Sequence, residues 1–220
     1  MWLRSHIPCS VPRRPGRRLP ITSDIPALKR AWRQDALAAR ARAAAEPGFT
    51  ERAAHGIAAH GMAFLKEMGL LQGRPAVISG FWPMGDEIDL RPLMTLLHDA
   101  GHGIALPVVV GKGLPLIFRA WRPETVLVPG VFGTETPEAD APECVPDILL
   151  VPLLAFGRDG ARLGYGGGFY DRTLRTLRRA KPVRAIGTAY ACQEREGIPM
   201  AAWDERLDAV LTEHGVIGTI

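Results

Sequence analysis

The sequence predicts an α/β fold, a single domain with a mostly parallel, twisted sheet flanked by helices. Strand-like and helix-like segments alternate along the chain, which is typical of parallel strands joined by crossover helices. The segment 147–155 is almost continuously apolar, as expected for a strand buried within such a sheet. The 220 residues, 47% hydrophobic and 23% charged, supply enough apolar side chains for one full core.

Two helices are expected before the first strand. The first covers about 24–45, where Ser23 and Asp24 can cap its start and Pro47-Gly48 ends it. The second begins at Thr50 and runs to about residue 68, where glycines stop it.

The remaining elements follow in alternation. We expect strands at 75–82, 104–110, 114–121, 147–155, 183–189 and 207–212, the last of them closing the fold at the C-terminus. Short helices are predicted at 90–100 and 170–179, and segment 122–146, with five prolines, is expected to be irregular.

The excess of positive charge belongs to the N-terminus. Residues 1–23 contain five of the 27 lysines and arginines and no acid, which leaves 22 basic against 23 acidic residues in the rest. We expect a disordered Arg/Pro-rich extension at 1–23, or an upstream start codon, and a folded domain at 24–220. A transit peptide is less expected, because four prolines interrupt any amphipathic helix.

A nearly neutral folded body argues against a nucleic-acid partner. Salt-sensitive nucleic-acid binding that is lost on deleting 1–23 would favour the opposite view. No apolar run reaches the roughly 18 residues that a membrane helix needs. The three cysteines are scattered and odd in number, which fits a reducing compartment, so we expect a cytoplasmic location. We also expect the protein to be a monomer.

A glycine-rich loop is the most informative feature. Gly164, Gly166, Gly167 and Gly168 stand between the apolar strand and a helix, an arrangement that presents backbone N–H groups to phosphate. The loop is not a Walker A motif, since no Lys-Ser or Lys-Thr follows, and not a Rossmann fingerprint, since Phe169 takes the third glycine position. A merely flexible turn stays open as an alternative.

The flanking residues have ordinary explanations when each is taken alone. Asp171 could be an acid favoured by the helix dipole, and Arg172 a solvated helix residue. Lys29 and Arg33 lie four apart on one helix face, which is usually solvated. Glu87 could be a loop acid beside its acidic neighbour.

Taken in order, the segments resemble a known family. Residues 162–172, preceded by Val151-Pro152 and Phe156, resemble the signature of the 5-formyltetrahydrofolate cyclo-ligase family. Three further segments, 28–33, 81–89 and 202–213, are similar to other parts of that family, so the resemblance covers about 26–213. Small departures are Gly167, where some members carry lysine, and Phe169, where tyrosine is common.

The resemblance implies a ring closure driven by ATP and Mg²⁺. In this family 5-formyltetrahydrofolate becomes 5,10-methenyltetrahydrofolate, with release of ADP and phosphate. Phosphorylation of the formyl oxygen makes it a good leaving group, and N10 then attacks the activated carbon. The expected partners are therefore 5-formyltetrahydrofolate and ATP.

The resemblance also implies roles for particular residues. Those expected to take part in catalysis are Arg162, Tyr170 and Arg172. Those expected to bind ATP are Lys29, Arg30, Arg33, Arg162, Leu163, Gly164, Tyr165, Gly166, Gly167, Gly168, Phe169 and Tyr170. Those expected to bind the folate are Trp82, Met84, Glu87, Tyr165, Gly166, Gly167, Gly168 and Phe169. The expected metal ligands are Asp171 and Asp208, since Mg²⁺ is usually held by one or two carboxylates together with phosphates.

Two other functions remain open at this point. One is a relative that uses the same ATP loop on another small substrate, and intact Trp82 and Glu87 argue against it. The other is a non-catalytic folate- or nucleotide-binding module, which would not need the two aspartates.

Overall fold

A seven-stranded sheet forms the centre of the computed structural model, which describes residues 25–218. The predicted extension 1–23 and the capping residues Ser23 and Asp24 lie outside the described residues. The strands are β1 (Val77–Ser79), β2 (Gly103–Val108), β3 (Ile117–Trp121), β6 (Ile148–Pro152), β9 (Arg184–Thr188), β10 (Ala209–Thr212) and β11 (Gly215–Ile217). Their order is β11-β10-β9-β6-β1-β2-β3. All neighbours pair in parallel except β2 with β3 and β10 with β11, so the predicted α/β class is confirmed.

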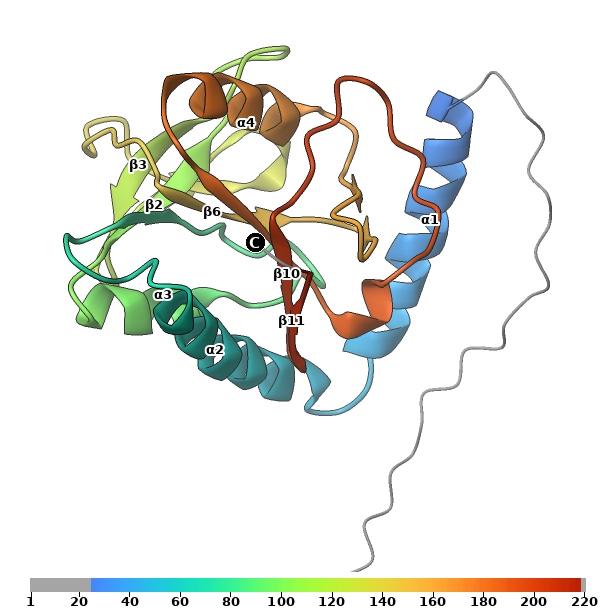
Figure 1. Cartoon of the computed structure of the whole chain (residues 1–220), viewed down its shortest axis with the longest axis horizontal. Coiled ribbons are helices and arrows are strands. Elements are labelled where there is room, and N and C mark those ends of the chain that lie inside the picture. The colour runs from blue at the N-terminus through green and yellow to red at the C-terminus, as the bar shows by residue number, and fades with distance from the viewer. Residues whose placement is uncertain (1–24, 219–220) are drawn as a thin grey trace, which may run out of the picture.

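Helices cover both faces of the sheet. Helices α2 (Phe49–Glu67) and α3 (Arg91–Asp99) lie on one face and α4 (Phe169–Ala180) lies on the other (Figure 1). Strand β6 serves both layers, because its successive side chains point to opposite faces. Ile148 and Leu150 pack in the cluster with α2 and α3, whereas Leu149 and Val151 pack with Leu174 of α4.

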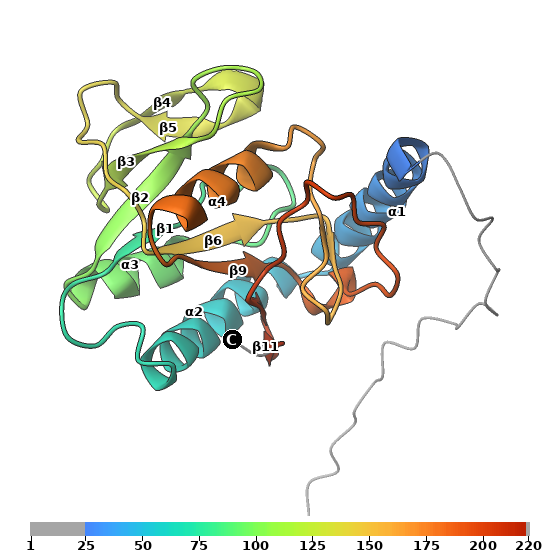
Figure 2. The same ribbon diagram turned by 45° about the horizontal axis from the view of Figure 1, so that its top comes forward.

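Helix α1 (Ile25–Ala44) stands apart from these layers, beside the end of the sheet (Figure 2). It packs on a small hairpin that follows β6, formed by β7 (Ala155–Phe156) and β8 (Arg162–Leu163). Ala36 of α1 is buried there with Leu154 and Leu163, and Trp32 packs against the same cluster. The contact holds α1 against the segment that leads into the glycine loop.

Both predicted N-terminal helices are present within two residues of the expected bounds. The prediction missed three short pairings. Segment 122–146 contains the hairpin β4 (Leu127–Pro129) and β5 (Glu135–Pro137), with the 3₁₀ turn η1 (Val131–Gly133) between them. The predicted strand 147–155 divides into β6 and β7, and β11 follows β10 where the last strand was expected to close the fold. The missed strands β4, β5, β7, β8 and β11 have two or three residues each, too few for a periodic pattern to be recognised.

A second 3₁₀ turn, η2 (Ala191–Gln193), follows β9. Within residues 25–218, no helix combines the length and the apolar character needed to cross a bilayer.

Candidate active site

The point where the strand order reverses lies between β1 and β6. The chain leaves β1 for β2 on one side, and it leaves β6 for β9 on the other. In open α/β sheets, ligands bind at such a switch point, beyond the carboxyl ends of the strands. Here the segment after β1 carries Glu87 and the segment after β6 carries the glycine loop, so two motifs far apart in sequence meet at this edge.

The glycine loop takes a conformation that favours glycine at two positions. Gly166 has φ of 98° and Gly168 has φ of 65°, both in the region that other residues rarely adopt. Gly168 is the N-cap residue of α4, so the loop leads directly into the N-terminus of that helix. An anion at this place would meet unpaired helix N–H groups and the positive end of the dipole.

One cationic side chain of α1 contacts the loop. Arg33 donates from Nε to the Gly164 carbonyl at 2.8 Å, and a Cβ on Gly166 would lie 3.1 Å from the guanidinium carbon. Lys29 is ion-paired with Asp204. Arg30, predicted with them, is exposed on α1. Burial lowers the pKa of Arg33, opposed by the nearby Asp204 carboxylate.

Asp171, in the first turn of α4, forms an ion pair with Arg162 of β8. Arg162 Nη2 lies 2.5 Å from Asp171 Oδ1, and the backbone N–H of Glu205 donates to the same oxygen at 3.0 Å. The Arg162 guanidinium, only 5% exposed, also donates to the Glu205 carbonyl. Burial lowers the pKa of Arg162, and the charge of Asp171 opposes that shift. The neighbouring Arg172 donates to the Gly167 carbonyl at 2.7 Å and so braces the loop.

The predicted metal pair Asp171 and Asp208 is not brought together. Asp208 precedes β10 at the amino edge of the sheet, where its Oδ2 accepts from Arg178 at 3.1 Å and from the Ala185 N–H at 2.6 Å. Arg178 is in the last turn of α4 and Asp171 in the first. At about 1.5 Å per residue, their separation of seven positions corresponds to about 10 Å along the helix. The physical reason is that α4 runs across the sheet, so its two ends lie at opposite edges.

Glu87 is a buried carboxylate, and each of its two oxygens accepts a hydrogen bond. Its Oε2 accepts from the Met84 N–H at 2.9 Å, and its Oε1 accepts from the Tyr165 hydroxyl. Burial raises the pKa of Glu87, while Tyr165, Met84 and the nearby Arg40 act to lower it. Burial and the Glu87 charge raise the pKa of Tyr165. The phenol is therefore a donor, and it joins the glycine loop to the segment after β1.

The other predicted side chains differ in their surroundings. The hydroxyl of Tyr170 is buried without a hydrogen-bond partner within the described chain, and burial raises its pKa. The ring centroids of Trp82 and Trp121 lie 6.4 Å apart. The guanidinium carbon of Arg91 lies 5.3 Å from the centroid of the Trp82 ring. Leu163, by contrast, is buried in the cluster under α1, so its side chain serves packing.

Three residues near the site were not predicted. Asp204 pairs with Lys29, Arg40 contacts Tyr165, and the ring of Phe132 lies 5.9 Å from that of Phe169. Asp204 belongs to the segment 202–213, which the resemblance already marked. Arg40 and Phe132 carry no local signal, because each reaches the site from an element distant in sequence.

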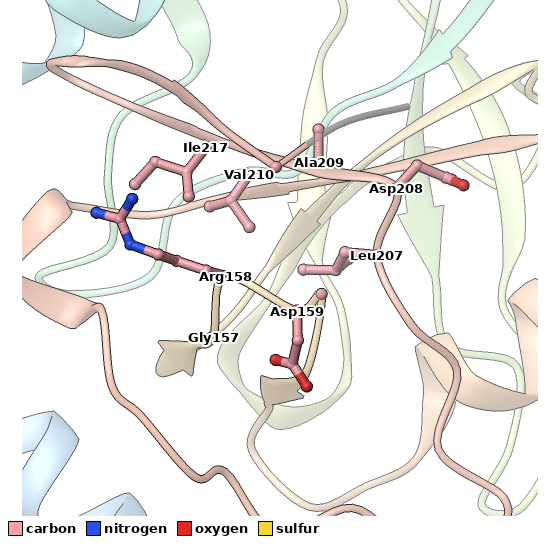
Figure 3. Close-up of a pocket in the computed structure, with 10 residues that line it drawn as sticks. Gly157, Arg158, Asp159, Leu207, Asp208, Ala209, Val210 and Ile217 are labelled. Carbon is pink, nitrogen blue, oxygen red and sulfur yellow. The ribbon is translucent and has the colours of Figure 1, made fainter.

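Two surface cavities lie elsewhere. One, of about 250 Å³, is lined by the turn 157–160 and by β10 and β11, and Figure 3 shows the Asp208 carboxylate directed away from Arg158 there. The other, of about 450 Å³, lies at the amino edge beside Asp147 and Lys181. We place the active site at the glycine loop instead, because both motifs and the switch point converge there.

Comparisons with known proteins identify the family of the chain. The chain matches the model of the 5-formyltetrahydrofolate cyclo-ligase family over residues 26–213. The 5-formyltetrahydrofolate cyclo-ligase of Escherichia coli (strain K12) is 36% identical over 143 residues, which cover 61% of this chain and 76% of that protein. The protein of the same name from Haemophilus influenzae is 34% identical over 151 residues, covering 66% of this chain and 80% of that one.

A solved structure has the same fold. The NMR structure of Aquifex aeolicus 5,10-methenyltetrahydrofolate synthetase aligns with a TM-score of 0.67 at 27% identity, covering 86% of this chain and 92% of that chain. Since the family model spans nearly all of the described residues, this chain belongs to the 5-formyltetrahydrofolate cyclo-ligase family.

Proposed function

We propose that this chain converts 5-formyltetrahydrofolate into 5,10-methenyltetrahydrofolate, with ATP as cosubstrate and ADP and phosphate as products. The observation that carries the proposal is the meeting of the glycine loop with the buried Glu87 at the switch point, joined by Tyr165. A phosphate-binding loop next to a buried carboxylate brings a phosphoryl donor beside a site that can accept hydrogen bonds from a pterin.

In this reaction the γ-phosphoryl group is transferred from ATP to the formyl oxygen: the bond from the γ-phosphorus to the β–γ bridging oxygen breaks, and ADP is released. N10 then bonds to the formyl carbon, the carbon–oxygen bond breaks, and phosphate departs with that oxygen. N10 gives up its proton to complete the ring. The protein must align ATP with the formyl oxygen and stabilise charge on the transferred group.

The cations around the loop are proposed to bind the phosphates. Arg33 and Arg172 donate to carbonyls of the loop. Lys29 and Arg162 are ion-paired with Asp204 and Asp171. A guanidinium has five N–H donors, so an arginine held by one partner can still bind phosphate oxygens. Their present contacts hold them in place before ATP arrives.

Asp171 is the residue proposed to hold Mg²⁺ with ATP. Its Oδ1 takes both hydrogen bonds, and no hydrogen bond within 25–218 engages Oδ2. No cluster of three metal-ligating side chains occurs among the described residues, so phosphate and water oxygens would complete the coordination. The ion would supply charge neutralisation on the phosphates. Asp208 has no place in this proposal, because it lies at the other edge of the sheet.

Glu87 is proposed to bind the amino-pyrimidine edge of the pterin, since a carboxylate can accept two N–H donors. Trp82 and Met84 are proposed to line the same pocket, and Phe169 and Tyr170 to stack on flat rings of the ligands. The bound state of both substrates, a monomeric state and a cytoplasmic location stay predictions.

The test is growth of methenyltetrahydrofolate absorbance with 5-formyltetrahydrofolate, ATP and Mg²⁺. We expect growth that depends on ATP. A folded protein that binds ATP and shows no growth would retain the nucleotide loop and contradict the folate assignment.

A further inference from the structure

Arg40 is a buried arginine that the proposed reaction does not use. Its side chain is 7% exposed, and it extends from α1 toward the segment after β1. Nη1 donates to the Tyr165 hydroxyl at 2.8 Å and lies 4.0 Å from Glu87 Oε1. The order of donation is therefore Arg40 to Tyr165 to Glu87.

A buried guanidinium needs a compensating charge, because desolvation of an unpaired ion is costly. Glu87 is the carboxylate within ion-pair distance of Arg40, and the Tyr165 hydroxyl bonds to both of them. The Nε of Arg40 is buried without a hydrogen-bond partner among residues 25–218, so the side chain is incompletely satisfied. Anchoring α1 would not need this arrangement, since Ala36 and Trp32 already pack that helix on the β7–β8 hairpin.

We propose that Arg40 is a positioning residue that holds the Tyr165 hydroxyl on Glu87 and thereby couples the ATP loop to the folate site. The inference rests on the proposed function for the identity of the two ligands. The contact geometry that it uses is independent of that function.

The coupling follows from competition for Glu87. Tyr165 belongs to the glycine loop, so a pterin that donates to Glu87 must displace or share the phenol. Either change alters the hydrogen bond that ties the loop to the segment after β1. Folate binding therefore changes the affinity of the loop for ATP, and by linkage ATP changes folate affinity by the same factor.

Arg40 also affects the charge state of Glu87. Both the Arg40 cation and the Tyr165 hydrogen bond favour the ionised carboxylate. Titratable groups from the other packed elements lie near it as well: Tyr165, Tyr170 and Tyr190. None of these tyrosines carries positive charge, so none can replace Arg40, and its loss raises the pKa of Glu87. The carboxylate is then protonated at a higher pH. Because the proposed folate site needs the ionised carboxylate, folate binding is lost at a higher pH as the solution is acidified.

The test compares Arg40→Met, Tyr165→Phe and the double variant, with Arg42→Met as control because Arg42 is exposed on the same helix. We expect Arg40→Met to raise the KM for 5-formyltetrahydrofolate about tenfold, the effect of losing one charge-assisted hydrogen bond. The acid limb in the pH profile of kcat/KM should also move to higher pH in Arg40→Met. Tyr165→Phe raises the same KM, and the double variant adds little, because the two residues act in one chain.

Two further measurements separate positioning from simple structural support. Titration with AMP-PNP, with and without 5-formyltetrahydrofolate, gives the coupling factor, which should fall toward one in both single variants. A ¹³C-carboxylate NMR titration reports the pKa of Glu87 without any turnover. If Arg40→Met does not fold, Arg40→Lys, which keeps the charge but not the fork of donors, and Tyr165→Phe carry the test.

Provided that the wild-type enzyme is active, either of two results would overturn the inference. One is additive effects of Arg40→Met and Tyr165→Phe in the double variant. The other is a Glu87 pKa in Arg40→Met that equals the wild-type value. Wild-type enzyme that forms no methenyl product would instead overturn the proposed function. In that case the NMR titration alone decides whether Arg40 positions Tyr165 on Glu87.

Discussion

Replacing Asp171 with asparagine tests whether the first turn of α4 belongs to the ATP site. The substitution preserves size and one acceptor oxygen while it removes the charge. In the structure that charge is paired with Arg162 at 2.5 Å, and the same oxygen also accepts from the Glu205 N–H at 3.0 Å. The change therefore acts on one ion pair and on the proposed bond to Mg²⁺.

The magnitude for stability follows from the burial of the pair. Arg162 is 5% exposed and Asp171 is 23% exposed. Removing one partner of a fully buried pair costs about 3–5 kcal/mol. The asparagine oxygen still accepts a hydrogen bond and the position is partly hydrated. We therefore expect the free energy of unfolding to fall by about 2 kcal/mol.

The effect on turnover should be larger than this. Loss of the carboxylate weakens Mg²⁺ binding and phosphoryl stabilisation, which we expect to reduce turnover at least about a hundredfold, or about 2.7 kcal/mol. The assay is ATP-dependent methenyl absorbance across a Mg²⁺ titration, with urea unfolding of the same samples. Asp208→Asn is the matched comparison and should lower stability while leaving the Mg²⁺ dependence unchanged.

Near-normal turnover of Asp171→Asn with wild-type Mg²⁺ dependence would refute the assignment of Asp171. A raised Mg²⁺ requirement in Asp208→Asn would instead show that the two edges of the sheet approach each other when ATP binds.

Three other predictions use the same assay or unfolding. Glu87→Gln should raise the KM for 5-formyltetrahydrofolate more than the KM for ATP, because it weakens the pterin acceptor; equal effects would contradict that role. At Asp147, burial acts to raise the pKa, but hydrogen bonds from the protein outweigh it and hold the pKa at about 2. This depressed value stabilises the fold fully above the ordinary pKa of 3.8, and the contribution is lost as pH falls toward 2. Asp147→Asn should therefore cost about 1 kcal/mol at pH 7, discounted for partial exposure, with a difference from wild type that vanishes near pH 2 in acid titrations. Gly166→Ala should cost about 1–2 kcal/mol of stability and raise the KM for ATP, because of its positive φ and the Arg33 contact. Gly164→Ala, with open space around it, is the control, and equal losses in both variants would contradict the conformational argument.

Local patterns in the chain were sufficient for much of the fold and part of the site. The parallel sheet follows from alternating periodicity, and α1 and α2 follow from long helical stretches bounded by glycine and proline. The glycine loop is recognisable because its chemistry is contained in a few consecutive residues. The segment with Glu87 is recognised through the family resemblance, because on composition alone Glu87 could be an ordinary loop acid.

Relations between distant elements could not be predicted in the same way. Nothing near Arg40 distinguishes it from Arg42, two residues on, yet one is buried against the site and the other is exposed. Its contact with Tyr165 spans 125 residues of sequence. Asp208 likewise follows the expected motif, and only the direction of β10 in the sheet places its carboxylate at the amino edge with Arg178.

The physical reason is the range over which each signal acts. Backbone preferences and hydrophobic periodicity act over a few residues, so they specify which elements form and where the loop lies. Which side chains share a buried site depends on strand order, on the edge at which each strand ends, and on the helix that packs there. Arg40, Tyr165 and Glu87 come from three such segments, and their common charge balance exists only once the sheet has assembled.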